Sequence, residues 1–349
     1  MVKMPGLNIG GLEIETCIIQ GGMGVGISLS GLASGVSNNG GIGNVASVGL
    51  GDHENFIGSY AEANAAGLRK EIMKTRKMTN GVFGVNVMKA LSDYDTLVQT
   101  VVEESVPLLF TGAGFDPDLP EKLRGSDTMA VPVISYAGFI PRVLDAWGDY
   151  RPAAIVIEGP MAGGHLGYGM KRLEKEGFIE GCLEKEVRKA VEVVRGLNIP
   201  IIAAGGIYTG ADIHRFLKLG ASGVQMGTRF VTTDECDADI RFKEEYLRAT
   251  EDDIILIKSP VGFPGRVVNN YFVENVGKGD KVVCPYHCLT ACKKEEATYC
   301  IADALKNAGA GNLEKGFAFA GANAYRCNEI IPVKELMDIL KEEYVVAAK

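Results

Sequence analysis

The chain has 349 residues, 46% of them hydrophobic, with a formal net charge of −8 and a sequence pI near 5.3. This length suits one large barrel or two ordinary domains, and the hydrophobic share is enough for a large core. The acidic balance argues against a nucleic-acid partner or an anionic membrane surface. The sequence shows no basic-then-apolar leader and no run near the roughly 18 apolar residues of a membrane span, so we expect a cytoplasmic protein. A homodimer is compatible with these properties.

Short apolar segments recur along the chain, and many of them begin or end in glycine. Runs of this kind are typical of buried parallel strands. We predict eight strands, within residues 17–25, 40–46, 81–88, 107–112, 131–135, 153–159, 200–207 and 222–230. Helical stretches follow them, as at Leu29, Leu32 and Val36, and this pattern predicts a (β/α)8 barrel with its function at the carboxyl ends of the strands. A doubly wound sheet is the main alternative, but glycine loops follow many strands here and not only the first.

The last two strands form a unit of their own. A helix is predicted between them over Thr209–Leu219, with Gly220 as its stop. Each strand ends in glycine, at Gly205 and Gly206 and again at Gly227, and Thr228 follows. Backbone N–H groups of such loops cradle a phosphate. The alternative is a plain βαβ repeat whose glycines are structural.

The alternation of strands and helices stops after Phe230. The pattern then predicts a helix over 238–251, a loop broken by proline and glycine over 258–270, and an amphipathic helix over 329–343. We therefore expect a barrel over residues 1–235, an appended cap or lid over 236–328, and a C-terminal helix within 329–349.

His165 is the main candidate for a catalytic residue. It lies among glycines directly after the sixth predicted strand, and the chain has only four histidines. An imidazole near its ordinary pKa transfers protons at neutral pH. The alternative is a loop histidine that only makes hydrogen bonds. We expect His53 and His214 to face solvent.

Six motifs in order resemble the nitronate monooxygenase family, formerly called 2-nitropropane dioxygenases. That family includes the flavin-dependent enoyl-ACP reductase II and NADH:quinone reductases. The resemblance covers residues 15 to about 275, and together the motifs are specific where each alone is weak. They are Gln20–Met23, Gly40–Gly43, Gly84–Asn86, Ala162–His165, Ala203–Ile207 and Val224–Phe230, with Gly265–Arg266 and Asn269–Asn270 beyond the barrel.

The resemblance implies a TIM barrel that binds FMN without a covalent bond at its carboxyl face. His165 would face the flavin ring. The phosphate would be held by Gly205, Gly206, Gly227 and Thr228. The ring would be lined by Gln20, Gly21, Gly22 and Met23, and the pocket would be completed by Asn86, Gly163, Gly164 and Gln225. The positions of three other residues suggest further roles. Glu158 ends a strand and would bind the ribityl chain or an ion, and Tyr136 would be either an aromatic wall of the pocket or a residue without a role in it. Asp212 would be an exposed carboxylate in the first turn of its helix.

The implied reaction is oxidation of small alkyl nitronates with O₂. The alternative is an NAD(P)H-dependent reductase of enoyl thioesters or quinones, with the nucleotide as co-substrate. The sequence does not separate the two activities, because both place the same histidine over the same ring.

Cysteines form the one departure from the family pattern. Cys17, Cys182, Cys236 and Cys327 are dispersed, and we expect them to be packed side chains without disulfides. The others are clustered as Cys284, Cys288, Cys292 and Cys300. Spacings of four place three thiols on one helix face or in a tight loop, which suits an iron–sulfur cluster or zinc, with His287 as a substitute ligand. The spacing matches no common ferredoxin or zinc motif, and reduced thiols packing a small subdomain are the alternative.

Overall fold

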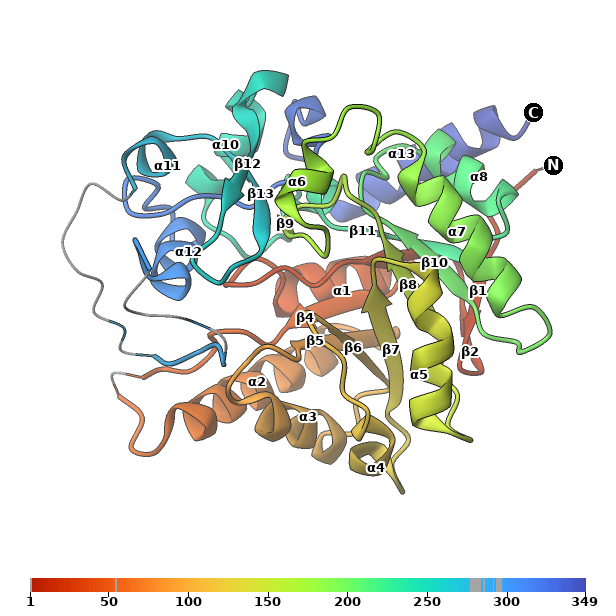
Figure 1. Cartoon of the computed structure of the whole chain (residues 1–349), viewed down its shortest axis with the longest axis horizontal. Helices are drawn as coiled ribbons and strands as arrows, with labels where there is room; N and C mark the ends of the chain where they lie inside the picture. The colour runs from red at the N-terminus through yellow and green to blue at the C-terminus, as the bar shows by residue number, and fades with distance from the viewer. Residues whose placement is uncertain (1, 54, 277–283, 285, 291, 293–296) are drawn as a thin grey trace.

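The computed structural model describes every residue except 1, 54, 277–283, 285, 291 and 293–296. At its centre, the described residues form an eight-stranded parallel sheet with the order β3-β11-β10-β8-β7-β6-β5-β4 (Figure 1). A parallel bridge between Ile19 and Ile42 links the two outer strands and closes the sheet. This confirms the predicted (β/α)8 TIM barrel. The strands are β3 (Ile18–Gln20), β4 (Gly43–Ala46), β5 (Phe83–Met88), β6 (Leu108–Gly112), β7 (Met129–Ile134), β8 (Ile155–Glu158), β10 (Ile201–Ala204) and β11 (Gly223–Met226).

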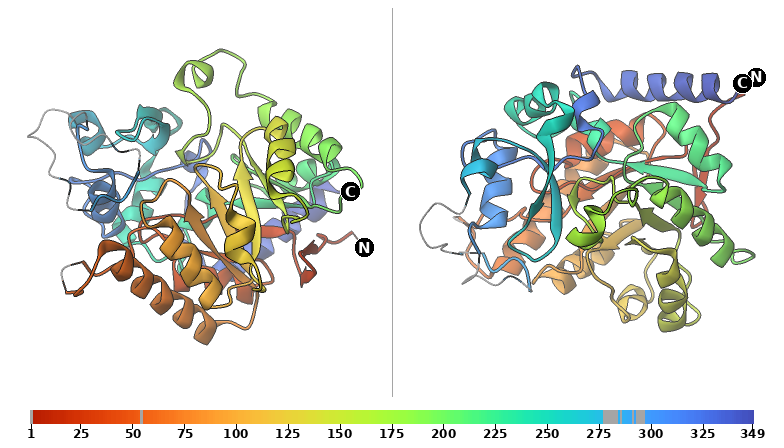
Figure 2. Two further views of the ribbon diagram at one scale, coloured as in Figure 1. Left: turned by 60° about the horizontal axis from the view of Figure 1, so that its bottom comes forward. Right: turned by 45° about the horizontal axis from the view of Figure 1, so that its top comes forward.

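Helices cover the outside of the barrel between the strands (Figure 2). They are α1 (Ser30–Asn38), α2 (Tyr60–Met78), α3 (Tyr94–Glu103), α4 (Leu119–Leu123), η1 (Ala137–Phe139), α5 (Ile140–Trp147), α6 (Met170–Leu173), α7 (Cys182–Val193), α8 (Gly210–Lys218) and α9 (Thr228–Val231). In α1, the predicted apolar positions Leu32 and Val36 are fully buried. The helix predicted over 209–219 is α8, and Gly220 beyond it has a φ of +97° that favours glycine.

A hairpin that the sequence reading missed precedes the barrel. Strands β1 (Leu7–Ile9) and β2 (Leu12–Ile14) pair antiparallel, with Gly10 and Gly11 at positive φ in the turn. Gly10 lies against Met129 at the start of β7. The hairpin therefore covers the amino-terminal end of the barrel, opposite the end where function was expected.

The region after Phe230 contains more regular structure than predicted. The helix expected over 238–251 is α10 (Ile240–Arg248), followed by η2 (Glu251–Asp253). Strands β12 (Ile254–Lys258), β13 (Pro264–Val268) and β9 (Gly164–His165) form a three-stranded antiparallel sheet. The expected loop over 258–270 is therefore wrong at 264–268, where all five residues are buried. Long-range pairing with β9 and β12 outweighs the local proline and glycine signals, and Pro264 stands at the first strand position, where proline is tolerated.

The remaining elements are α11 (Tyr271–Asn275), α12 (Ile301–Gly309), η3 (Ala324–Arg326) and α13 (Val333–Ala347). The predicted C-terminal helix is confirmed as α13, which packs along α8 and brings the two chain ends close together (Figure 2). Phe242 and Tyr246 of α10 belong to the same hydrophobic core as the barrel strands. The expected boundary near residue 235 therefore does not divide this core. Among the described residues, no helix has the length and apolar character needed to cross a membrane.

Candidate active site

The first loop of the site follows β3 and lies over two amides, one from β11 and one from β5, which are separated by β3 and β4 in the closed barrel. Gln20 ends β3, Gln225 lies in β11 and Asn86 in β5. A Cβ on Gly21 would be 3.5 Å from Gln225 Nε2, and a Cβ on Gly22 would overlap Asn86. The structure thus brings together these predicted residues, and only glycine allows the loop to approach the amides so closely.

Polar atoms without partners lie buried at this end of the barrel. Both amide atoms of Asn44, Gln225 Oε1 and Ser47 Oγ have no hydrogen-bond partner in the structure, and Asn44 is 0% exposed. Leaving a buried polar atom unpaired costs roughly 1–3 kcal/mol, so these groups are suited to a polar ligand. The sequence reading missed Asn44 and Ser47, although a polar residue within the apolar run 40–46 was a visible signal.

The two predicted phosphate loops have the backbone shape that anion binding requires. Gly205 and Gly206 follow β10 with φ of +92° and +86°, and Gly227 and Thr228 follow β11. A Cβ on Gly206 would be 2.6 Å from Met161 Cβ. No hydrogen bond among the described residues uses the N–H of Gly206 or Gly227. These donors fit a phosphate.

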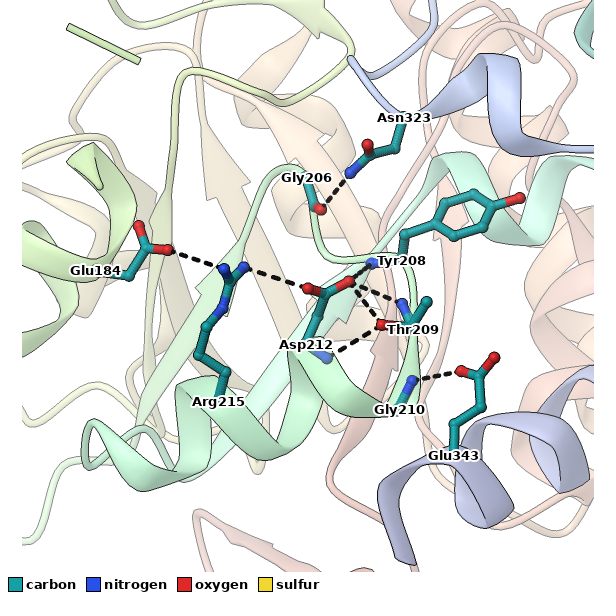
Figure 3. Close-up of polar contacts among 9 residues, drawn as sticks. All are labelled: Glu184, Gly206, Tyr208, Thr209, Gly210, Asp212, Arg215, Asn323 and Glu343. Atoms are coloured by element: carbon teal, nitrogen blue, oxygen red, sulfur yellow. Dashed lines mark hydrogen bonds and ion pairs between the residues drawn. The ribbon is translucent and has the colours of Figure 1, made fainter. Parts of the chain in front are cut away.

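A third segment, missed from the sequence, joins these loops. Asn323 Nδ2 donates to Gly206 O at 2.7 Å (Figure 3). Gly321 N donates to Thr228 Oγ1 at 3.0 Å. Predicted Gly163 lies against the same segment, with a Cβ position 2.6 Å from the carbonyl carbon of Ala320. The only signal for this segment in the sequence was a run of small residues before Asn323. No local pattern indicated that the segment contacts a loop more than 100 residues earlier.

Asp212 has a different role from the expected exposed carboxylate. Its Oδ2 accepts hydrogen bonds from Tyr208 N, Thr209 N and Thr209 Oγ1, and its other oxygen pairs with Arg215 at 3.2 Å (Figure 3). Thr209 Oγ1 accepts from Asp212 N in return, which makes a capping box. The carboxylate thus fixes the loop between β10 and α8.

His165 is held between two parts of the region beyond the barrel. It lies in β9 opposite Gly265, its Nε2 is 2.8 Å from Ser259 Oγ, and its ring meets the Phe319 ring edge at 4.9 Å between centroids. Burial lowers the pKa of His165 to about 4. The expectation of a pKa near neutrality is therefore wrong, and the imidazole is neutral at neutral pH because desolvation disfavours its charged form.

Arg266 fixes the loop that leads to His165. Its Nη1 donates to Pro160 O at 2.6 Å and to Ala162 O at 2.7 Å, and the residue is only 4% exposed. Burial lowers the pKa of Arg266 to about 10, which still leaves it charged at neutral pH. Gly164, with φ of +80°, pairs with Arg266 in the small sheet.

Glu158 stands at the carboxyl end of β8. Burial raises the pKa of its carboxyl from 4.5 to about 7. A group with this pKa exchanges protons near neutral pH. From the sequence, Glu158 was predicted to bind the ribityl chain or an ion. Its capacity to exchange protons near neutral pH could not be predicted from the sequence, because that capacity depends on burial.

Tyr136 lies beside a cavity of about 590 Å³. Arg172 donates to Tyr136 Oη at 3.0 Å, and the Tyr168 ring meets the Tyr136 ring at 4.9 Å. The cavity is lined by four cationic side chains, Arg172, Lys175, Lys185 and Lys189, and three acidic ones, Glu176, Glu180 and Glu186. Tyr136 thus lines a cavity that contains none of the other residues predicted for the flavin pocket, so its predicted place in that pocket stays a prediction.

Two histidines expected to face solvent are instead packed on tyrosines. His53 stacks on Tyr60 with 4.6 Å between ring centroids, and His214 meets Tyr344 of α13 at 5.3 Å. Both are half-buried. These expectations are wrong because the partners come from distant or opposing elements.

The four cysteines that are clustered in the sequence also lie around one cavity in the structure, whereas the four dispersed cysteines do not. Cys284, Cys288, Cys292 and Cys300 line one small cavity together with His287. In the part of the chain that the structure describes, no three or more His, Cys, Asp or Glu side chains are close enough, as they stand, to hold a metal ion. A preformed site for a single zinc ion is therefore not supported. Cys17, Cys236 and Cys327 are buried and Cys182 is half-buried, and none forms a disulfide.

Comparison with known proteins gives one family. The model of the family described as nitronate monooxygenase matches residues 7–96 and 88–343. A similar protein from Staphylococcus haemolyticus, named probable nitronate monooxygenase, is 28% identical over 313 residues, which is 79% of this chain and 81% of that protein. A (3aS,4S,5R,7aS)-5-hydroxy-7a-methyl-1-oxo-octahydro-1H-indene-4-carboxyl-CoA dehydrogenase from Rhodococcus jostii is 30% identical over 263 residues. That match covers 75% of this chain and 65% of the dehydrogenase.

Two solved structures resemble the whole chain. FabK from Thermotoga maritima has a TM-score of 0.74 and 29% identity, over 96% of this chain and 94% of its own. Nitroalkane oxidase from Streptomyces ansochromogenes has a TM-score of 0.73 and 24% identity, over 96% and 97%. At that identity, the second likeness bears on the fold alone.

Proposed function

Because this chain belongs to the nitronate monooxygenase family, we propose that it is an FMN-dependent oxidoreductase. The observation that carries the proposal is the pair of glycine loops with unpaired N–H groups, at Gly206 and Gly227, next to the unpartnered buried amides of Asn44 and Gln225. One part of this site suits an anion, and the other suits a flat polar ring.

Each group of residues has a role in this proposal. The loops at Gly205–Gly206 and Gly227–Thr228 bind the phosphate, and the segment 320–323 keeps them in place. Gln20–Met23, Asn86 and Gln225 line the ring, with Gly163 and Gly164 beside it. A bound flavin would supply the redox chemistry, since it takes electrons from one substrate and gives them to another.

The leading reaction is oxidation of alkyl nitronates with O₂. The Staphylococcus relative is named for this activity. Since burial keeps His165 neutral, its ring can accept a proton from a substrate or donate a hydrogen bond to it, and Ser259 fixes the ring orientation. Glu158 is a second proton carrier at the same face of the barrel.

A second candidate is NAD(P)H-dependent reduction of a thioester substrate. It is favoured by the 590 Å³ cavity at Tyr136, where the four cationic side chains, which stand beside three acidic ones, offer partners to a phosphate-bearing carrier. A small nitronate carries no phosphate that would need the cationic side chains of such a cavity. The Rhodococcus relative is named for a CoA-linked substrate, which also carries phosphates.

Anaerobic reduction of the purified yellow protein tests the proposal. We expect FMN to be released on denaturation, and finding FAD or no flavin after reconstitution would overturn the cofactor assignment. Bleaching of the flavin by a nitronate alone would support the leading reaction. Bleaching by NADH or NADPH, followed by reoxidation with an enoyl-CoA, would support the second.

A cavity variant separates the two reactions further. Replacing both Lys185 and Lys189 by Glu should raise the KM for a thioester without changing the KM for a nitronate, because only the thioester carrier reaches these side chains. An unchanged thioester KM would remove the cavity from the argument.

A further inference from the structure

The four clustered cysteines form a second centre outside the flavin site. Their thiols come from a stretch of 17 residues, and all line the same small cavity. Cys288 is 6% exposed, and the other three are half-buried at its edge. Four clustered cysteine thiolates are the usual ligands of structural zinc and of iron–sulfur clusters.

The segment around Cys288 is attached to the barrel near the flavin site. Ser92 N donates to Cys288 O at 3.1 Å, and Thr290 N donates to Ala90 O at 3.0 Å. Leu91 and Leu289 form an antiparallel bridge between these bonds. This loop directly follows β5, the strand that carries Asn86.

Cys300 is held by a helix. It is the N-cap residue of α12, which has nine residues, although its side chain makes no capping hydrogen bond. The positive end of the helix dipole would stabilise a ligating thiolate at this position. At its other end α12 is anchored to the barrel side, since Asp239 N donates to Gly309 O at 2.9 Å.

The shared cavity also brings the charges of the ligands together. Cysteine ligates metals as a thiolate, and four thiolates around one small cavity repel one another unless a cation lies between them. Bound iron would offset their charge, which is the usual reason that clustered thiols lose their protons.

The geometry points to an iron–sulfur cluster of the [4Fe–4S] type, bound by Cys284, Cys288, Cys292 and Cys300. A single zinc ion would need all its sulfurs about 2.3 Å from one point, whereas a four-iron cluster takes one thiolate on each iron, so its ligands stand farther apart. The cavity that the thiols line measures about 20 Å³, so binding of the cluster would require the thiols to move apart. Four S–H bonds are replaced by four Fe–S bonds, four protons pass to solvent, and no electron is transferred when the cluster is delivered intact.

Elemental analysis of anaerobically purified protein tests this inference. We expect about four iron and four sulfide per chain and an EPR signal after reduction with dithionite. Cys288→Ser should lose the iron and sulfide. Cys292→Ser provides a second test at a more exposed position, where the folding risk is smaller. Cys182→Ser is the matched control, because this half-buried thiol lies outside the cluster and should keep the wild-type metal content.

Flavin content is measured on the same samples and keeps the two proposals separate. All three variants should retain the wild-type ratio of FMN to protein, because none of these cysteines belongs to the flavin site. Zinc without iron, neither metal, or full iron content in both Cys288→Ser and Cys292→Ser would overturn the cluster. None of these results would bear on the FMN assignment.

Discussion

At the scale of single residues, burial determines the chemistry that His165 and Glu158 can perform. The ordinary pKa values of the two groups are 6.5 for the imidazole and 4.5 for the carboxyl. Burial disfavours charge in both cases, so it lowers the pKa of the imidazole and raises the pKa of the carboxyl. Both groups are therefore largely uncharged in mildly acidic solution.

Replacing His165 by Ala should lower turnover by roughly 10²–10⁴ while FMN remains bound, because the ring takes part in proton transfer and not in holding the phosphate. Ser259→Ala removes only the 2.8 Å partner of the ring and should have a smaller effect. Steady-state kinetics and flavin content of the two variants provide the measurement. Wild-type turnover in His165→Ala would assign the ring a packing role, and a rise in KM alone would assign it to substrate binding.

Glu158 should make the stability of the protein depend on pH. Its folded pKa of about 7 lies above the ordinary value of 4.5, so between these values the folded state holds a proton that the unfolded state has lost. The stabilising effect is complete below about pH 4.5 and is lost as the pH rises through 7. Urea unfolding of wild type and Glu158→Gln across this range, at equal flavin content, should show a weaker decline in the variant. Parallel curves would show that Glu158 does not titrate in this way.

At the scale of elements, the loop after β10 combines two constraints. Its glycines have positive φ, and Asp212 and Asn323 hold the loop from the α8 side and the 320–323 side (Figure 3). A loop fixed from both sides keeps its backbone shape before any ligand arrives. Such preorganisation lowers the entropic cost of binding an anion.

Gly206→Val should therefore empty the flavin site. The new side chain would need a φ of +86° and would place its Cβ 2.6 Å from Met161 Cβ. Gly262→Val is the matched control, because Gly262 has the same φ of +86° but open space around its Cβ position. The ratio of FMN to protein after purification distinguishes the two. Equal flavin content in both variants would mean that the phosphate does not depend on this loop.

At the scale of the whole molecule, the barrel is not a separate unit from the chain that follows it. The antiparallel sheet takes β9 from the middle of the barrel sequence, and α13 covers the barrel beside α8 and α1. Glu343 Oε2 accepts from Gly210 N at 2.6 Å, next to the capping box that shapes the phosphate loop. The C-terminal helix thus supports both the core and the site.

Leu340→Ala should lower the free energy of unfolding by about 2–5 kcal/mol, because the fully buried side chain leaves a cavity between α13 and the barrel. Leu197→Ala is the control with the same chemical change at a position that is 40% exposed, and it should change stability by less than about 1 kcal/mol. Urea unfolding of both variants gives the comparison. An equally small effect at Leu340 would show that α13 contributes little to the common core.

The sequence alone determined the barrel, because each strand is a short apolar run and many of these runs begin or end in glycine. The same local signals identified the glycine loops at Gly206 and Gly227, which we propose bind the phosphate, and the clustering of four cysteines, since these features do not depend on distant residues. The helical spacing of apolar residues within 329–343 likewise predicted the C-terminal helix.

Only the tertiary structure decided which distant residues complete the site. Asn323, Ser259 and Phe319 reach the loops and His165 from segments about 90 to 150 residues away, and no local pattern encodes such contacts. The 264–268 strand forms because it finds partners in β9 and β12, against its own proline and glycine. The pKa values of His165 and Glu158 depend on desolvation, which exists only once the chain has folded around them.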